Sequence, residues 1–201
     1  ISCLTILIYS SLRIVMVKLL DTDIKTSEVK NWKGINILHF KGSSCSQKLR
    51  IFLNEKKIKW KSHHINLVNG DNFSEWFLGI NPRGIVPVLV DDGEVHIESN
   101  DIIKYLDKKF QSNLLWPENF KEEIEELLEE ENNIHFDLRN LTMKFVAPTF
   151  LMKKKDEDIK NFENASNFVE GLEDKEKKMQ LSYHKNFIKN DGVQIDSVVN
   201  S

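Results

Sequence analysis

Three serine hydroxyls and a cysteine thiol occupy four consecutive positions of the sequence, Ser43, Ser44, Cys45 and Ser46. They follow the strand-forming residues 35–38 and a glycine, and serines are favoured where a helix begins, so a strand here leads directly into a helix. The first turn of a helix leaves backbone N–H groups unpaired and carries partial positive charge, so it stabilises an anion, and a thiolate more than a thiol. The sequence therefore predicts an anion site at this helix start. The alternative is that the serines only cap the helix.

Residues 34–112 supply the elements that must position this turn. Their patterning predicts, in chain order, a strand over 35–38, a helix over 43–55, a strand over 60–67, a short helix over 73–80, strands over 84–90 and 94–97, and a helix that ends at Phe110. The strand–helix–strand start favours a parallel first pair, and Asp92-Gly93 predicts a hairpin between the last two strands. The expected fold is α/β, a βαβ unit followed by a short helix and a ββα unit, around one mixed sheet.

Two further features are expected at the same edge of that sheet as the serine turn. Pro87 stands at the mouth of a strand, where a proline removes no ladder hydrogen bond. A cis peptide bond there would turn the Val86 backbone outward, and the alternative is an ordinary edge-strand proline. Glu98 and Ser99 precede an amphipathic helix, so Ser99 is expected to cap a second helix start and to offer a spare hydroxyl.

The segment before this unit, residues 1–33, is expected to be an N-terminal extension. Its apolar first 20 residues are interrupted by Arg13 and Lys18, so they lack the uninterrupted apolar run of a membrane span. Met16 is the expected natural start, with a signal peptide as the competing interpretation. Residues 18–33 are expected to form a polar, flexible lead-in.

The segment after a short linker, residues 118–201, is expected to form an all-helical, partial C-terminal domain. A long helix is predicted to end at Pro148, and two weaker helical patterns cover 156–169 and 174–188. The apolar residues expected to face inward from the two weaker patterns are Ile159, Phe162, Phe168, Met179, Tyr183 and Phe187.

Composition narrows the classes of function. The 201 residues carry 28 Lys and Arg against 31 Asp and Glu, a net charge of -3, and no basic stripe with interleaved aromatic residues, which argues against a nucleic-acid partner. Cys3 and Cys45 cannot build a disulfide framework and favour a reducing, cytoplasmic location. Since no zinc-ligand or phosphate-loop spacing occurs, no metal site is expected.

Three segments in this order resemble a known family. They are Ser43–Ser46 at the first strand–helix turn, Asn81–Leu89 around Pro87, and Ile97–Ser99 before the last helix. Together they resemble the N-terminal, thioredoxin-like domain of cytosolic glutathione transferases, and the serine turn looks most like the zeta class. Residues 46–50 and 75–78 are instead similar to ganglioside-induced differentiation-associated proteins and to bacterial etherase or dehalogenase-type members. The resemblance implies a thioredoxin-like domain over 34–112.

The resemblance also implies roles for particular residues. Ser43 would donate a hydrogen bond to the sulfur of glutathione, with Ser44 and Cys45 as alternative catalytic groups. Thiol-type relatives place their cysteine at the position of Ser43, so disulfide exchange at Cys45 is the less favoured alternative. The remaining glutathione contacts would come from the Val86 backbone before a cis-Pro87, from Glu98 and Ser99 at the γ-glutamyl end, and from Arg83 near the glycyl carboxylate.

The function that this resemblance implies is glutathione-dependent transfer, in which the glutathione thiolate attacks a small electrophilic substrate, as in detoxification. Two alternatives stay open: a zeta-like glutathione-dependent isomerase, and a non-catalytic binding or interaction protein with the same fold. The resemblance further implies a cytoplasmic homodimer that uses glutathione as co-substrate and no metal.

Overall fold

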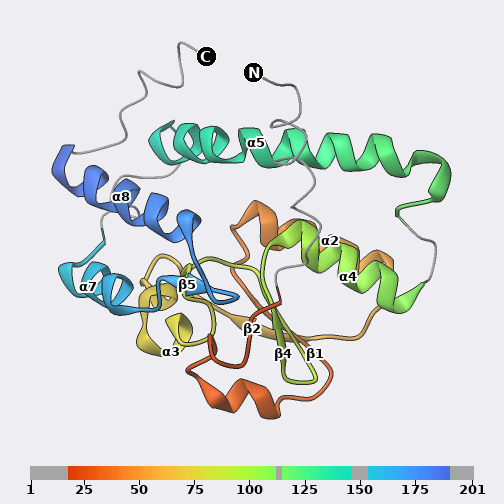
Figure 1. Cartoon of the computed structure of the whole chain (residues 1–201), viewed down its shortest axis with the longest axis horizontal. Helices are drawn as coiled ribbons and strands as arrows, with labels where there is room; N and C mark the ends of the chain where they lie inside the picture. Colours follow the sequence, from red (N-terminus) through yellow and green to blue (C-terminus); the bar gives the residue numbers. More distant parts are fainter. Residues whose placement is uncertain (1–17, 112–114, 146–153, 191–201) are drawn as a thin grey trace, which may run out of the picture.

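The computed structural model describes residues 18–111, 115–145 and 154–190, in a sheet-based part and a helical part (Figure 1). The helices are α2 (Ser44–Glu55), α3 (Glu75–Leu78), α4 (Ser99–Phe110), α5 (Lys121–Phe145), α7 (Asp156–Asn164) and α8 (Lys175–Asn190). The strands are β1 (Ile35–His39), β2 (Lys61–His64), β3 (Val88–Asp91), β4 (Glu94–His96), β5 (Phe168–Val169) and β6 (Leu172–Glu173). Short 3-10 helices are η1 (Ser27–Asn31), η2 (Asp71–Phe73) and η3 (Glu118–Phe120).

The main sheet has four strands in the order β2-β1-β3-β4. β1 runs parallel to β2 and antiparallel to β3, and β3 pairs antiparallel with β4. The predicted parallel pair, hairpin and mixed sheet are therefore confirmed. The sheet and its helices form a thioredoxin-like domain, which a helical region follows.

Helices α2 and α4 cover one face of this sheet (Figure 1). Because side chains alternate along a strand, Ile35 and Ile37 of β1 point into that layer with Leu89 of β3. The side chains that α2 and α4 bury there are Leu49, Phe52, Leu53, Ile102, Ile103 and Leu106. This packing fixes where the first residues of both helices lie.

The opposite face is covered partly by the segment that precedes β1. Leu19, Ile24 and Val29 are buried in that core, and the backbone N–H of Leu19 donates to the carbonyl of Val95 (2.9 Å). The expectation of a flexible lead-in over 18–33 is therefore wrong: its polar residues hid an apolar set that covers the sheet. Met16 and the residues before it lie outside the described part of the chain.

The helical region contains a short β-hairpin that the sequence did not predict. The expected helix over 156–169 ends at Asn164, and the chain then forms β5, turns at Gly171 with φ +76° and returns as β6. Phe168 is consequently 53% exposed rather than inward, whereas Phe162 is fully buried as expected. The inward prediction holds for Ile159 and is wrong for Met179, which is 41% exposed.

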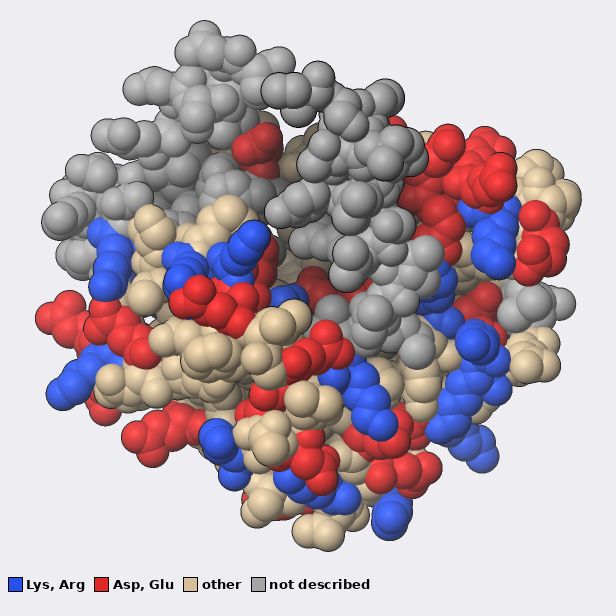
Figure 2. Space-filling view, viewed as in Figure 1, with Lys and Arg blue, Asp and Glu red and all other residues tan. Residues whose placement is uncertain are grey.

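The surface of the face shown in Figure 2 mixes acidic and basic side chains. Acidic side chains are densest over the first half of α5, where Glu122, Glu123, Glu125, Glu126, Glu129 and Glu130 occur. Of the helices in the described part of the chain, none combines the length and hydropathy that crossing a bilayer requires.

Candidate functional site

The register of the sheet brings the three predicted site segments to one edge. Leu38, near the end of β1, pairs with Val88 at the start of β3, so the turn after β1 lies beside Pro87. His96, the last residue of β4, pairs with Leu89, so the chain leaves β4 at this same edge and enters α4. The serine turn, the Val86–Pro87 bond and the start of α4 are therefore neighbours, as the sequence predicted.

Ser43 is the N-cap residue of α2. Its backbone is extended (φ -82°, ψ 125°), and its hydroxyl oxygen accepts a hydrogen bond from the backbone N–H of Ser46 (3.3 Å). A hydroxyl that accepts still has its hydrogen to donate. Gly42 before it does not adopt a left-handed conformation; a Cβ there would lie 2.9 Å from Cε1 of Phe40, so the glycine is explained by this close approach.

Cys45 lies one residue inside α2 and faces helix α5. Its Sγ atom is 3.8 Å from Nε2 of His135. Burial raises the pKa of the Cys45 thiol, but the interactions with His135, Lys48 and Ser99 outweigh that effect, so the net pKa is lowered. The thiol is therefore nearer to a thiolate than an ordinary cysteine is.

A polar network fixes α5 over the starts of α2 and α4. Lys48 Nζ donates to Oδ1 of Asn100 (2.5 Å) and to Oε1 of Glu131 (3.4 Å). Asn100 Nδ2 donates to the other carboxylate oxygen of Glu131 (2.6 Å). The Asn100 and Lys48 contacts oppose the effect of burial and lower the pKa of Glu131 overall, so this carboxylate remains charged between the helices.

Glu98 precedes α4 in a backbone conformation with φ +67°, which is uncommon for a residue other than glycine. Such conformations persist where the surrounding structure enforces them, often at ligand sites. Ser99 is the first residue of the helix, and Glu98 holds the N-cap position without a side-chain cap bond. The expectation that Ser99 caps α4 is therefore wrong, and its hydroxyl interacts with the thiol of Cys45 instead.

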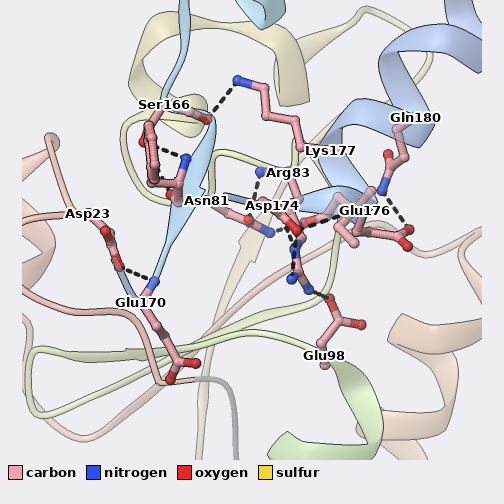
Figure 3. A network of polar contacts seen from close by, with 12 residues as sticks. Asp23, Asn81, Arg83, Glu98, Ser166, Glu170, Asp174, Glu176, Lys177 and Gln180 are labelled. Atoms are coloured by element: carbon pink, nitrogen blue, oxygen red, sulfur yellow. Dashed lines mark hydrogen bonds and ion pairs between the residues drawn. The ribbon is translucent and has the colours of Figure 1, made fainter. Parts of the chain in front are cut away.

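Arg83 lies between two carboxylates, as Figure 3 shows. Its Nη1 donates to Oε1 of Glu98 (2.5 Å), and its Nε and Nη2 donate to the two carboxylate oxygens of Asp174 (2.8 and 3.0 Å). Its burial opposes the charge, but both carboxylates outweigh burial and raise the pKa of Arg83 further above its usual range. Arg83 and Glu98, expected at opposite ends of glutathione, thus contact each other directly.

The Val86–Pro87 peptide bond is cis, which agrees with the conformation expected from the sequence. Val86 is 9% exposed and lies just outside the ladder that joins β1 to β3.

His135, Glu131 and Asp174 are site residues that the sequence analysis did not select. Glu131 and His135 are four positions apart on one helix, a spacing that places side chains together, and Glu131 Oε1 lies 3.7 Å from Nδ1 of His135. That pair was visible in the sequence, but its proximity to Cys45 was not. Asp174 has no local motif, because its partner Arg83 is 91 positions away.

Across residues 18–111, 115–145 and 154–190, no three His, Cys, Asp or Glu side chains are grouped so that they could hold a metal ion.

Residues 42–109 match the family described as "Glutathione S-transferase, N-terminal domain". The chain is 37% identical over 90 residues to a "Glutathione S-transferase zeta class" of Euphorbia esula, a match that covers 45% of this chain and 40% of the relative. It is 38% identical over 71 residues to a "Maleylacetoacetate isomerase" of Pseudomonas aeruginosa, covering 34% of each protein. The chain therefore spans less than half the length of these curated relatives.

Among solved structures, the chain is similar to the beta-etherase LigF of Sphingobium sp. strain SYK-6. The TM-score is 0.60 at 23% sequence identity, and the match covers 83% of this chain and 66% of that one. At this identity the likeness concerns the fold.

Proposed function

Because the chain belongs to the cytosolic glutathione transferase superfamily, we propose that it binds glutathione at the sheet edge described above and activates its thiol for attack on a small electrophile. The glutathione-binding domain comprises residues 34–112, and the helical region from residue 118 borders the site of the second substrate. The proposal extends to a homodimer in a cytoplasmic setting.

In this proposal the glutathione sulfur sits over the first turn of α2, and the hydroxyl of Ser43 donates a hydrogen bond to it. A free thiol is mostly protonated at neutral pH, and each unit by which its pKa falls corresponds to about 1.4 kcal/mol in favour of the thiolate. A hydroxyl donor together with the positive end of a helix supplies such a preference. The thiolate then attacks an electrophilic carbon, and the leaving group departs with the electron pair of the bond that breaks.

The rest of glutathione would lie along the same edge. The Val86 backbone pairs with the cysteinyl unit, and Glu98 and Ser99 at the start of α4 hold the γ-glutamyl end. Arg83 orients Glu98 through their ion pair and lies close enough to that carboxylate to add positive charge at the rim of the site. The observation that carries the proposal is the sheet register, because it brings Ser43, Pro87 and Glu98 to one edge from three separate elements.

A second candidate function is glutathione-dependent cis–trans isomerisation, which the similarity to a zeta-class transferase and to a maleylacetoacetate isomerase favours. In that reaction the glutathione thiolate adds to a double bond and leaves again, so the same Ser43 site is used. A third candidate is a non-catalytic binding protein, which the direct pairing of Glu98 with Arg83 favours, since it occupies a carboxylate that glutathione would need.

One pair of measurements on the whole chain separates these candidates. Calorimetry with glutathione tests binding, and turnover of a generic aryl halide tests transfer, each with wild type and Ser43→Ala. Transfer requires binding together with turnover that falls by about 100-fold or more in Ser43→Ala. Binding without turnover of the aryl halide or of a maleyl-type double bond supports the non-catalytic protein. Absence of binding refutes all three.

A further inference from the structure

Cys45, His135 and Glu131 form a line of three groups that join α2 to α5. The Cys45 sulfur lies 3.8 Å from Nε2 of His135, and the other ring nitrogen, Nδ1, lies 3.7 Å from Oε1 of Glu131. With its proton on Nδ1, facing the carboxylate, the ring presents the lone pair of Nε2 to the thiol. Nucleophile, base and orienting carboxylate in this order are the arrangement that activates a nucleophilic side chain.

The surroundings of Cys45 favour its ionised form from more than one side. It lies in the first turn of α2, where backbone N–H groups and the helix dipole stabilise negative charge. Lys48, one turn further along α2, and His135 from α5 supply positive charge, and Ser99 from α4 interacts with the sulfur. Glu131, the nearby carboxylate, contacts Lys48 and His135 and so moderates both cations.

We propose that Cys45 is a second reactive centre, which reduces mixed disulfides between glutathione and small thiols, with His135 as its base and Glu131 as the residue that positions His135. The inference rests on the proposed function in one respect, because the glutathionyl half of the substrate occupies the glutathione site beside Ser43. The partly buried position of Cys45 under α5 fits a small disulfide better than one on a folded protein.

The reaction has two balanced steps. First, the proton of Cys45 passes to Nε2 of His135, and the thiolate attacks the glutathionyl sulfur of GS–SR. A bond forms between Cys45 and that sulfur, the S–S bond breaks, and RS⁻ leaves with its electron pair and takes the proton from His135. Second, the thiolate of another glutathione attacks the same glutathionyl sulfur, which gives GSSG and returns Cys45 as a thiolate. The sum is GSSR + GSH → GSSG + RSH.

The second thiol of this cycle comes from glutathione because Cys45 is the only cysteine in the described part of the chain. A resolving cysteine is therefore absent from residues 18–111, 115–145 and 154–190. A one-cysteine cycle of this kind needs a glutathione site beside the reactive sulfur, and two residues separate Cys45 from Ser43 in the same helical turn.

The test uses the whole chain, the mixed disulfide of glutathione and 2-mercaptoethanol, and glutathione, with GSSG formation followed through glutathione reductase and NADPH. We expect Cys45→Ser to lose exchange by about 100-fold or more, and His135→Asn to lose about 10-fold or more. Glu131→Gln should fall between wild type and His135→Asn. The matched controls are His64→Asn, an exposed histidine on β2, and Glu130→Gln, the exposed neighbour of Glu131 on the same helix; both should keep wild-type exchange.

Two readouts distinguish chemistry from a structural role. The pH dependence of Cys45 alkylation should move to higher pH in His135→Asn, and intact mass should show one glutathionyl group on wild type and none on Cys45→Ser. Wild type that binds glutathione in calorimetry but never carries this adduct would overturn the inference and leave the proposed function standing. A Cys45 adduct formed from bis(2-hydroxyethyl) disulfide in protein that does not bind glutathione would refute the proposed function and support the reactive centre. Neither adduct nor binding would refute both.

Discussion

Both carboxylate oxygens of Asp174 accept hydrogen bonds from Arg83, which lies 91 positions earlier in the chain. Asp174 also accepts from the backbone N–H of Glu176 (3.2 Å) at the start of α8. This single carboxylate therefore joins the helical region to the loop that leads to Pro87.

The Arg83–Asp174 pair should contribute strongly to stability. Its side chains are 14% and 4% exposed, and removing one partner of a buried pair leaves an uncompensated charge. We expect Asp174→Ala to lower the free energy of unfolding by about 3 kcal/mol in urea titrations. The control is the adjacent Glu173→Ala, whose partner Lys178 is exposed, with an expected loss below about 1 kcal/mol. Equal losses in the two variants would contradict the assignment.

Lys177 should make stability depend on pH. It is 1% exposed, its Nζ donates to the carbonyls of Ala165 (2.6 Å) and Ser166 (2.8 Å), and burial lowers its pKa from 10.5 to about 8. Between these two values the unfolded chain holds a proton that the folded protein has lost, so the free energy of unfolding rises with pH. This contribution is complete above the unfolded value and is lost as the pH falls through about 8.

The measurement for Lys177 is the difference in the free energy of unfolding between wild type and Lys177→Met across that range. The difference should shift in favour of wild type by at most about 1.4 kcal/mol per pH unit. Lys178→Met, at an exposed neighbouring position, should follow the wild-type curve. A Lys177→Met curve parallel to that of wild type would show that this ammonium does not titrate as described.

Gly93 should tolerate no side chain. It lies in the hairpin between β3 and β4 with φ +92°, and a Cβ there would be 2.3 Å from the backbone oxygen of Lys30. Gly93→Ala therefore adds a clash to an unfavourable conformation, and we expect a loss of about 3 kcal/mol in thermal or urea unfolding. Gly171→Ala, with φ +76° and nothing within 4 Å, should cost only about 1 kcal/mol. The reverse order would mean that η1 does not pack against this hairpin.

Glu98 should contribute to glutathione affinity. Its unusual backbone conformation places it at the start of α4 beside Ser99, and its carboxylate would meet the γ-glutamyl ammonium. We expect Glu98→Gln to raise the calorimetric Kd about 10-fold, which is about 1.4 kcal/mol. Glu94→Gln, at the opposite end of β4, serves as the control and should bind as wild type does. Unchanged affinity in Glu98→Gln would remove this carboxylate from the site.

The features that the sequence predicted correctly depend on local patterns. Alternating apolar residues, the Asp92-Gly93 turn and the position of Pro87 identify strands and their order, and Ser43 is a local helix signal. Once strand order is known, the sheet register follows, and so does the meeting of the three segments at one edge.

The features that were missed depend on contacts between distant segments. Leu19, Ile24 and Val29 are too widely spaced to predict an element, yet each fills the uncovered face of the sheet. The helical pattern over 156–169 continues past Asn164 in composition, but Val169 is buried against the main sheet, and that packing requires a hairpin.

Cys45 shows the same limit within the site. Its helix position could be predicted, but its reactivity depends on His135, 90 positions away, and therefore on how α5 packs across α2.

The most direct test of the central claim is the ionisation state of glutathione bound at the start of α2. The ultraviolet absorbance of the thiolate would be followed against pH with saturating glutathione, for wild type and Ser43→Ala, and repeated with Cys45→Ser so that the signal comes from glutathione alone. The account predicts a thiolate at neutral pH in wild type and in Cys45→Ser, with a shift to higher pH in Ser43→Ala. Bound glutathione that titrates as the free thiol does, or that titrates identically with and without the Ser43 hydroxyl, would contradict it.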